Sequence, residues 1–525
     1  VIDANGAAKH REPDGSESSE QYVQPAYLPG GEGSKQVIIP LVERLVHEGK
    51  KVIVFRSTKG TAEGTAGYLR QYLELPPADS ALSSLPAGDL SASSQFLRSC
   101  LRGGVGFHNS DLDRDERSAL EAAFRDKDSA LRVLVSTTTL AMGVNTPAEA
   151  VVIAGLQHPF SSPYSVAEYK NMAGRAGRPG LAAAGESYIV ASNRPSPNEA
   201  WHRYVLGQPE PVISHFLDGT TDPQTIIVRS LTALGRSVEE QELVDLLENS
   251  YAIWYQEHTG QGQSWDRYAL QSDLKALISS GLLDREPSGV ITLTALGQFA
   301  GVSGLEVRSV AQVSSAMRFV GPVLDLPNLI LLAQVTVELD GVYVPRNKKS
   351  HQEMQRWPNT LLQLGCARTL VRALHVGGGD PTVRAKRAVA ALRFVSEAPM
   401  QTIESDLTQH MRESSIAGPI RAAAHRTRDV VAAVCQIATL QGHSLARDDL
   451  ADLAGVLLET GAPLRQAELA LLLGSRLTRA QYLNLLSAGV MTATALLEAG
   501  ENTIREILGK TTANAVLADI RGDHA

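Results

Sequence analysis

Two arginines set three residues apart among small residues are the part of this sequence best suited to chemistry. The stretch YKNMAGRAGRPG, residues 169–180, holds Arg175 and Arg178, which would project from the same side of a helix. Gly174 and Gly177 remove bulk beside them, so another surface can approach closely. Guanidinium groups bind phosphate oxygens in pairs. The pattern indicates an arginine finger that stabilises a transferring phosphoryl group, although an arginine-rich helix end closed by Gly and Pro explains the same residues equally well.

Hydroxyl side chains follow two apolar runs elsewhere in the chain. Residues 136–139 read STTT after LRVLV, and residues 57–59 read STK after KKVIVFR. Hydroxyls and backbone N–H groups beyond the end of a strand can hold the phosphates of a nucleic-acid strand. For residues 136–139, a Ser/Thr cluster that caps the helix expected to begin near Leu140 is the alternative interpretation.

The elements that must position these residues alternate between strand and helix patterns. Four short β-branched runs predict strands within residues 50–57, 103–110, 131–138 and 148–155, and helical periods separate them. Such alternation predicts an α/β domain with a parallel sheet, whose ligands lie beyond the carboxyl ends of the strands. Residues 1–35 are polar and end in PGGEGSK, which indicates a linker.

Beyond about residue 205 the pattern changes. Asp222, Pro223 and Gly235 mark the start and end of a helix, and Ser237 with Glu240 predicts a capping box on the next one. A third helix and a hairpin with a Pro-Ser-Gly turn complete a winged-helix pattern. Residues 301–465 are almost wholly helical by period, which predicts a bundle, and short amphipathic helices follow in residues 466–525.

Four segments in order resemble motifs of superfamily 2 helicases of the Ski-like DExH-box group. They are KVIVFRSTKGTAEGTA, GVGFHNSDLDRDER, VLVSTTTLAMGVNTPAEAVVI and YKNMAGRAGRPG. The resemblance implies that residues 36–204 are the second RecA-like domain of such an enzyme. The rest of the chain resembles archaeal-type DNA repair helicases in the order and the composition of its segments. Their winged-helix domain would correspond to residues 205–300, their ratchet domain to residues 301–465 and their helix-hairpin-helix domain to residues 466–525.

The resemblance also implies residue roles. Arg175 and Arg178 would reach the γ-phosphate of ATP, Gly174 would allow its close approach, and Gly143 and Asn145 would lie near the nucleotide. The residues implied to contact the strand in this domain are Ser57, Thr58, Lys59, Thr137, Thr138 and Thr139. The chain departs from the family at Asn171, where a glutamine is usual, and at His108-Asn109, where two histidines are usual.

One helix of the expected bundle, AGPIRAAAHRTRDVVAAVCQIATLQG, has two distinct stripes. Arg421, His425 and Arg428 recur at helical spacing beside an apolar stripe. This arrangement suits a ratchet helix whose cations contact the backbone of a strand, and a solvated basic face explains it equally well. The apolar stripe is expected to hold Ile420, Ala424, Thr427, Val431, Val434 and Ala438.

The sequence lacks the other half of an ATPase. No GxxxxGK[ST] loop and no DExH box occurs, so ATP with Mg²⁺ would be bound mainly by a first RecA-like domain, supplied in cis or in trans. The start at Val1 and the two later motifs favour a fragment or a split enzyme over a degenerate binding protein. We expect the C-terminal portion of an ATP-dependent 3′-to-5′ helicase, acting on DNA rather than RNA and inactive alone. The alternatives are a non-catalytic nucleic-acid-binding protein and a protein-interaction subunit.

Composition limits these hypotheses. The net charge of −8 means that nucleic acid would need a local basic lining, and 5% aromatic residues leave few stacking platforms. Cys100, Cys366 and Cys435 lack metal-site spacing and are expected in the core of a cytoplasmic protein. No apolar run is long enough to predict a membrane span.

Overall fold

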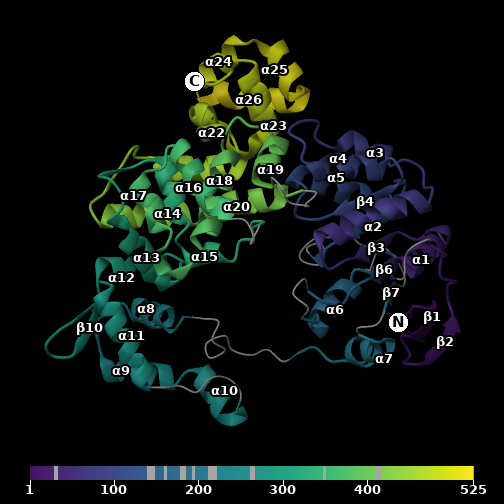
Figure 1. Cartoon of the computed structure of the whole chain (residues 1–525), viewed down its shortest axis with the longest axis horizontal. Helices are drawn as coiled ribbons and strands as arrows, with labels where there is room; N and C mark the ends of the chain where they lie inside the picture. The colour runs from purple at the N-terminus through teal and green to yellow at the C-terminus, as the bar shows by residue number, and fades with distance from the viewer. Residues whose placement is uncertain are drawn as a thin grey trace. The chain divides into compact units, whose positions relative to one another are not determined.

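The computed structural model divides the chain into two compact units. The first comprises Val1–Pro211 with Glu413–Gly418, and the second Val212–Arg412 with Pro419–Ala525. Figure 1 colours the chain from its N-terminus to its C-terminus. The structure describes residues 1–28, 33–138, 148–158, 162–177, 185–191, 195–210, 222–260, 267–346, 351–408 and 415–523.

A five-stranded parallel sheet forms the core of the first unit. The strands are β3 (Val52–Phe55), β4 (Val105–His108), β5 (Val133–Ser136), β6 (Ala150–Ile153) and β7 (Glu186–Ile189). Their order is β4-β5-β3-β6-β7, and all neighbours are parallel. The α/β fold class and the first four strands are therefore confirmed. The sequence did not predict β7, because its first half is exposed and polar and lacks an apolar run.

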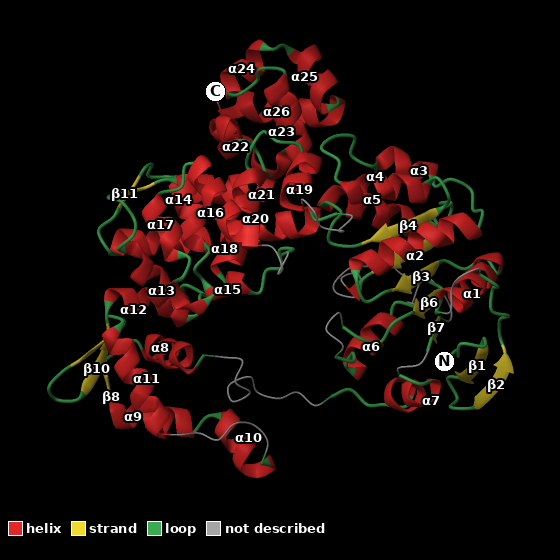
Figure 2. Ribbon diagram, viewed as in Figure 1, coloured by secondary structure: helices red, strands yellow, loops and turns green. Residues whose placement is uncertain are grey.

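Helices surround this sheet (Figure 2). Those of the first unit are α1 (Lys35–His47), α2 (Lys59–Tyr72), α3 (Asp79–Ser84), α4 (Ala92–Leu101), α5 (Arg114–Arg125), α6 (Val166–Ala173), α7 (Pro197–Ala200) and the π-helix η2 (Trp201–Val205). α2 and α4 pack on β4, and α6 packs on β6. A capping box determines where α5 begins. The Asp113 side chain accepts a hydrogen bond from the Glu116 backbone N–H, and the Glu116 side chain accepts one from the Asp113 backbone N–H.

The polar N-terminal segment is a folded part of this unit, and the linker expected over residues 1–35 is wrong for most of its length. Strands β1 (Ala7–Arg11) and β2 (Glu17–Gln21) form an antiparallel hairpin. Ile2 is buried and bridges Val190, donating from its backbone N–H to the carbonyl of Ile189 at 2.8 Å. The segment therefore covers the edge of the sheet beside β7, a contact that its polar composition concealed.

The second unit begins with three helices and a hairpin that the sequence predicts, α8 (Pro223–Leu234), α9 (Glu240–Glu248), α11 (Arg267–Ser279) and β9 (Leu283–Arg285) with β10 (Val290–Leu293). Three further elements were not predicted: β8 (Val238–Glu239), α10 (Tyr251–Thr259) and α12 (Ala295–Val302). Asp222 caps α8 and Gly235 ends it in a left-handed conformation, as predicted. The capping box expected from Ser237 and Glu240 is wrong, because Val238 and Glu239 pair with β10 and the Ser237 hydroxyl bonds to Thr292.

Helices make up nearly all of the remainder. The bundle contains α13 (Val307–Met317), α14 (Leu326–Ala333), α15 (Val337–Asp340), α16 (His351–Gln363), α17 (Arg368–Ala373), α18 (Pro381–Phe394), α19 (Met400–Thr408), α20 (Ala417–Leu440), α21 (Leu450–Thr460) and α22 (Ala467–Leu473). β11 (Val323–Leu324) and β12 (Ser444–Leu445) pair within it. The tail holds α23 (Arg479–Ser487), α24 (Ala493–Glu498), α25 (Glu501–Leu508) and α26 (Lys510–Asp523).

A buried arginine forms hydrogen bonds between the tail and the bundle. Arg479, at the start of α23, donates to the carbonyls of Phe394, Ser396 and Ala398 at 2.9, 3.1 and 2.7 Å. All three cysteines are free and buried, and burial raises the pKa of the Cys435 thiol to about 11. Among the described helices, none combines the length and the apolar character that crossing a bilayer requires.

Candidate functional site

The carboxyl edge of the sheet brings the two hydroxyl segments together. Phe55 at the end of β3 pairs with Ser136 at the end of β5, and the Arg56 N–H donates to the Ser136 carbonyl at 2.8 Å. The residues that follow these strands, 57–59 and 137–138, therefore lie on one edge, as the sequence predicts for parallel strands. Thr137 is buried and Thr138 half-buried. Thr139 lies outside the described residues.

The side chains of residues 57–59 are already engaged within the unit. Thr58 is the N-cap of α2 and forms a capping box with Thr61. Lys59 pairs with buried Asp111 at 2.9 Å. Burial raises the pKa of Tyr164, and its phenol hydrogen-bonds Ser57. Thr58 therefore caps a helix, and Asp111 and Tyr164 are site neighbours that the sequence did not single out. The helix expected near Leu140 lies outside the described residues.

The turn around Arg175, residues 174–177, lies at the opposite, amino edge of the same sheet. We call it the arginine turn. α6 follows β6 and returns across the sheet, beginning with a capping box between Ser165 and Glu168. Ala148, just before β6, donates to the Arg175 carbonyl at 3.1 Å and accepts from the Gly177 N–H at 3.0 Å. The unit therefore presents two chemically distinct edges, hydroxyls at one and the arginine turn at the other.

Arg175 is buried, whereas the arginine-finger interpretation requires an exposed side chain. Its exposed fraction is 4%, and it has an interaction partner within the protein. Its backbone forms part of the pairing with Ala148, so the side chain begins from a fixed, enclosed position. Gly174 caps α6 with a φ of −67°, a conformation open to any residue. Arg178, Gly143 and Asn145 lie outside the described residues.

Two other glycines hold the turn in shape. Gly177 has a φ of +67°, in the left-handed region that favours glycine. A Cβ on Gly185 would lie 2.2 Å from the backbone of Ala176 and of Gly177. The strand leading into β7 therefore packs directly on the main chain of the arginine turn.

We expect Gly185→Ala to destabilise the first unit by about 1–3 kcal/mol, because the new methyl group meets backbone that cannot rotate away. Gly64→Ala is the matched control. Gly64 lies in α2 with nothing within 4 Å of its Cβ position, so alanine there should stabilise by about 0.5–1 kcal/mol. Urea unfolding followed by circular dichroism measures both, and equal stabilities of the two variants would contradict the packing.

His108 and Asn109, where the sequence departs from the helicase pattern, have structural contacts. His108 is buried, and its Nε2 lies 3.0 Å from Glu121, which lowers the pKa of that carboxyl. Asn109 donates to Glu63 at 3.0 Å and accepts from the backbone of Asp111 at 2.9 Å. Both side chains therefore hold the loop after β4 in place.

Helix α20 has the buried stripe that its period predicts. Ile420, Ala424, Thr427, Val431, Val434 and Ala438 are all buried. The three cations beside that stripe are half-buried. His425 Nε2 lies 3.2 Å from the Glu459 carbonyl, and Arg428 pairs with the carboxylates of Glu459 and Asp429. Arg421 also has an interaction partner. A ligand at this stripe would therefore compete with carboxylates of the bundle.

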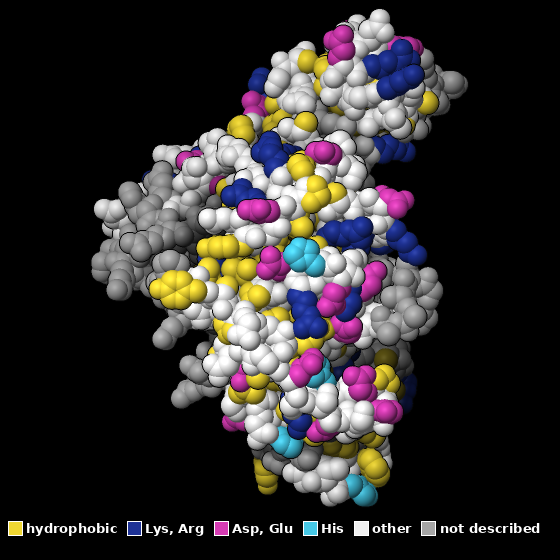
Figure 3. Space-filling view, turned by 90° about the vertical axis from the view of Figure 1, so that its right-hand side faces the viewer, with side chains coloured by type: hydrophobic (Ala, Val, Ile, Leu, Met, Phe, Trp, Pro, Cys, Tyr) yellow, Lys and Arg dark blue, Asp and Glu magenta, His cyan; other side chains and the backbone are white. Residues whose placement is uncertain are grey.

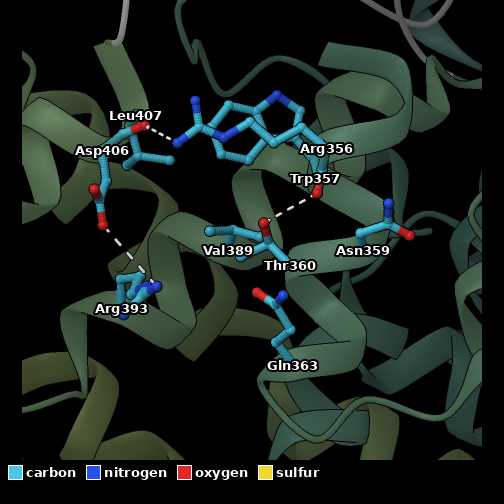
Figure 4. A pocket seen from close by; sticks show the side chains of 9 residues that line it. All are labelled: Arg356, Trp357, Asn359, Thr360, Gln363, Val389, Arg393, Asp406 and Leu407. Carbon is cyan, nitrogen blue, oxygen red and sulfur yellow. Dashed lines mark hydrogen bonds and ion pairs between the residues drawn. The ribbon is translucent and has the colours of Figure 1, made fainter. Parts of the chain in front are cut away.

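A polar cavity of about 410 Å³ lies between α16, α18 and α19 (Figure 4). Arg356 donates to the Asp406 carbonyl at 2.9 Å, and Arg393 lies 3.9 Å from the Asp406 carboxylate. The indole of Trp357 forms a buried wall with Arg356 over its ring. Two guanidinium groups thus contact Asp406, Arg356 at its backbone carbonyl and Arg393 near its carboxylate. No local sequence pattern indicates this arrangement, because it is assembled from three helices.

Charged side chains on the face in Figure 3 are mixed in sign. Dark blue and magenta groups alternate among the described residues of this face and do not gather into one basic field. This agrees with the net charge of −8 and means that nucleic acid would be held by local contacts.

The parallel sheet is a RecA-like domain. Residues 87–180 match the family model of the helicase conserved C-terminal domain, which covers β4, β5, β6 and the arginine turn. The chain resembles the C-terminal part of superfamily 2 DNA helicases of the archaeal type.

Several curated proteins similar to this chain are named as ATP-dependent DNA helicases. The chain is 32% identical to ATP-dependent DNA helicase Hel308 of Caldivirga maquilingensis over 236 residues, which cover 42% of this chain and 30% of that protein. It is 32% identical to the Hel308 of Pyrobaculum calidifontis, over 50% of this chain and 37% of that one. It is 30% identical to the Hel308 of Thermoplasma volcanium, over 51% of this chain and 38% of that protein. The chain thus spans less than half the length of these relatives.

Proposed function

We infer that this chain is the C-terminal portion of an ATP-dependent DNA helicase with 3′-to-5′ polarity, completed by a first RecA-like domain in cis or in trans. The observation that carries the proposal is the pair of opposite sheet edges on one RecA-like domain. Hydroxyls at the carboxyl edge suit a strand backbone, and the arginine turn at the amino edge suits a nucleotide phosphate. Similarity to proteins named ATP-dependent DNA helicase supports it.

The residues of this chain fit half of an ATP site. The segment of residues 169–180 carries two arginines that would supply positive charge for phosphate oxygens, with Arg178 as the proposed finger beside buried Arg175. Among the described residues, no group of three or more His, Cys, Asp or Glu could hold a metal ion. We therefore assign Mg²⁺ and most of the triphosphate to the first lobe, where the metal would neutralise charge on the transferring phosphoryl group.

On the strand side, we propose that residues 57–59 and 137–139 contact phosphates, with Arg421, His425 and Arg428 of α20 contacting the strand further along. The amino end of α2 is suited to this role, even though Thr58 and Lys59 have internal partners and the Thr137 N–H donates to the His108 carbonyl. A helicase assay of the chain with a P-loop and DExH-box polypeptide tests the whole proposal. Strand-stimulated ATP hydrolysis and unwinding from a 3′ tail support it, and strand binding with no effect of ATP favours a non-catalytic binder.

We expect Glu459→Gln to strengthen binding of the chain to a thymidine oligonucleotide by about two- to fivefold, because it releases Arg428 from a competing carboxylate. Arg428→Ala should weaken binding and reduce the salt slope by about one. The control is Glu397→Gln, which changes the net charge equally but frees Arg465 in another part of the bundle. Fluorescence anisotropy measures each affinity, and equal effects of the two glutamine substitutions would remove Arg428 from the strand site.

A further inference from the structure

Helix α10 is an addition to the three-helix pattern of the winged-helix region, and it carries an exposed aromatic face. Tyr251, Trp254, Tyr255 and His258 recur at i, i+3, i+4 and i+7, which places them on one side of the helix. Tyr251 is 61% exposed and Trp254 52% exposed, while Ala252 and Ile253 on the other side are buried. Large exposed rings on one face mark an interaction surface, because they leave apolar area in water.

The rings are ordered against one another. Trp254 stacks on Tyr251 with centroids 5.8 Å apart and on His258 with centroids 4.4 Å apart. His258 Nδ1 donates to the Trp254 carbonyl at 2.7 Å, which fixes the imidazole in this stack. A partner therefore meets a preformed platform and orders few side chains on binding.

The charge around this platform selects the partner. The segment from residue 239 to 260 contains no Lys or Arg, and its carboxylates are Glu239, Glu240, Glu242, Asp245, Glu248 and Glu257. Arg285 and Arg236 neutralise Glu240 and Glu242. Glu248 and Glu257 are exposed, and by helical period Glu257 flanks Trp254. Phosphates would be repelled here, whereas a guanidinium would gain both carboxylate and ring contacts.

We propose that the aromatic face of α10, formed by Tyr251, Trp254, Tyr255 and His258, docks an arginine-bearing segment of a partner protein. Arginine stacks on the rings while Glu248 and Glu257 pair with its charge. Tyr, Trp and Arg are the residues that dominate the binding energy of protein interfaces. The proposal stands independently of the helicase function, since it uses no residue of the RecA-like domain.

The test titrates the full chain into a labelled peptide of alternating Arg and Leu, with a Glu-Leu peptide and a thymidine oligonucleotide as the other probes. We expect the Arg-Leu peptide to bind and Trp254→Ala to weaken it about tenfold or more. The double variant Glu248→Gln with Glu257→Gln should weaken it several-fold and flatten its dependence on salt between about 0.05 and 0.3 M. Tyr343→Ala, which removes a tyrosine that is 57% exposed in the bundle, is the control and should change nothing.

Two results would overturn the proposal. One is equal affinity of the native and Trp254→Ala chains for the Arg-Leu peptide. The other is an oligonucleotide affinity that falls on Trp254→Ala while peptide binding does not, which would make α10 a base-stacking platform. Because Trp254 is exposed, we expect Trp254→Ala to leave the fold intact. An unchanged circular dichroism spectrum of the variant checks this.

Discussion

Arg178→Ala is expected to lower ATP turnover by at least about 10³-fold when the chain is combined with a polypeptide carrying the P-loop and DExH box. The reason is electrostatic. Charge on the transferring phosphoryl group would be stabilised by this guanidinium. Arg175, the other arginine of the segment, is 4% exposed and is too enclosed to replace it. Steady-state ATP hydrolysis with saturating oligonucleotide measures the effect. Oligonucleotide affinity should change little, because the strand contacts proposed above lie at the other edge of the sheet.

Arg175→Ala is the informative comparison. Because Arg175 is buried and has a partner, its loss should lower both the stability of the first unit and ATP turnover, whereas Arg178→Ala should lower turnover alone. ATP hydrolysis that survives in the Arg178→Ala chain would refute the finger assignment. A loss of oligonucleotide binding as large as the loss of turnover would refute the division of roles between the two sheet edges.

Arg387→Met is expected to destabilise the second unit by about 3–5 kcal/mol. Arg387 on α18 is 0% exposed, and its Nε donates to the Gln334 side chain at 2.7 Å and its Nη2 to the Gln334 carbonyl at 3.1 Å. Burial lowers its pKa to about 10, so the side chain stays charged at neutral pH. Methionine fills similar volume but leaves those buried acceptors without donors.

The same substitution at an exposed position is the control for this experiment. Arg368→Met on α17 should change stability by less than about 0.5 kcal/mol, since Arg368 is exposed. Urea unfolding of the full chain, followed by fluorescence, measures both variants. Equal stabilities would show that the buried network contributes nothing. Gln334 also donates to Thr427 on α20 at 3.0 Å, so the network links α18 to the helix proposed to contact the strand.

Helix α18 illustrates how far sequence patterns reach. The sequence analysis predicts helices throughout residues 301–465, and α18 is one of them, with Asp380 as its cap and Pro381 at its first position. Its three cations Arg384, Lys386 and Arg387 are all buried, although charged side chains are mostly exposed in proteins. Their acceptors come from distant positions: Asp340 binds Arg384 at 2.8 Å, and Glu353 binds Lys386 at 2.9 Å. A local window contains no information about such partners.

The sequence by itself determined the features that depend on interactions between residues close together in the chain. Four of the five parallel strands, the start and end of α8, and the buried stripe of α20 follow from side-chain periodicity and from capping residues within a few positions of each other. The motifs of the RecA-like domain were readable in the same way, because each is a continuous segment beside one strand.

Only the tertiary structure decided which of those residues are free to act. It buried Arg175, paired Lys59 with Asp111 and Arg428 with Glu459, and folded the polar N-terminal segment onto the sheet edge. Each of these outcomes joins residues that are at least tens of positions apart or depends on how a whole layer packs. Burial and ion pairing are properties of such long-range contacts, so local composition does not specify them.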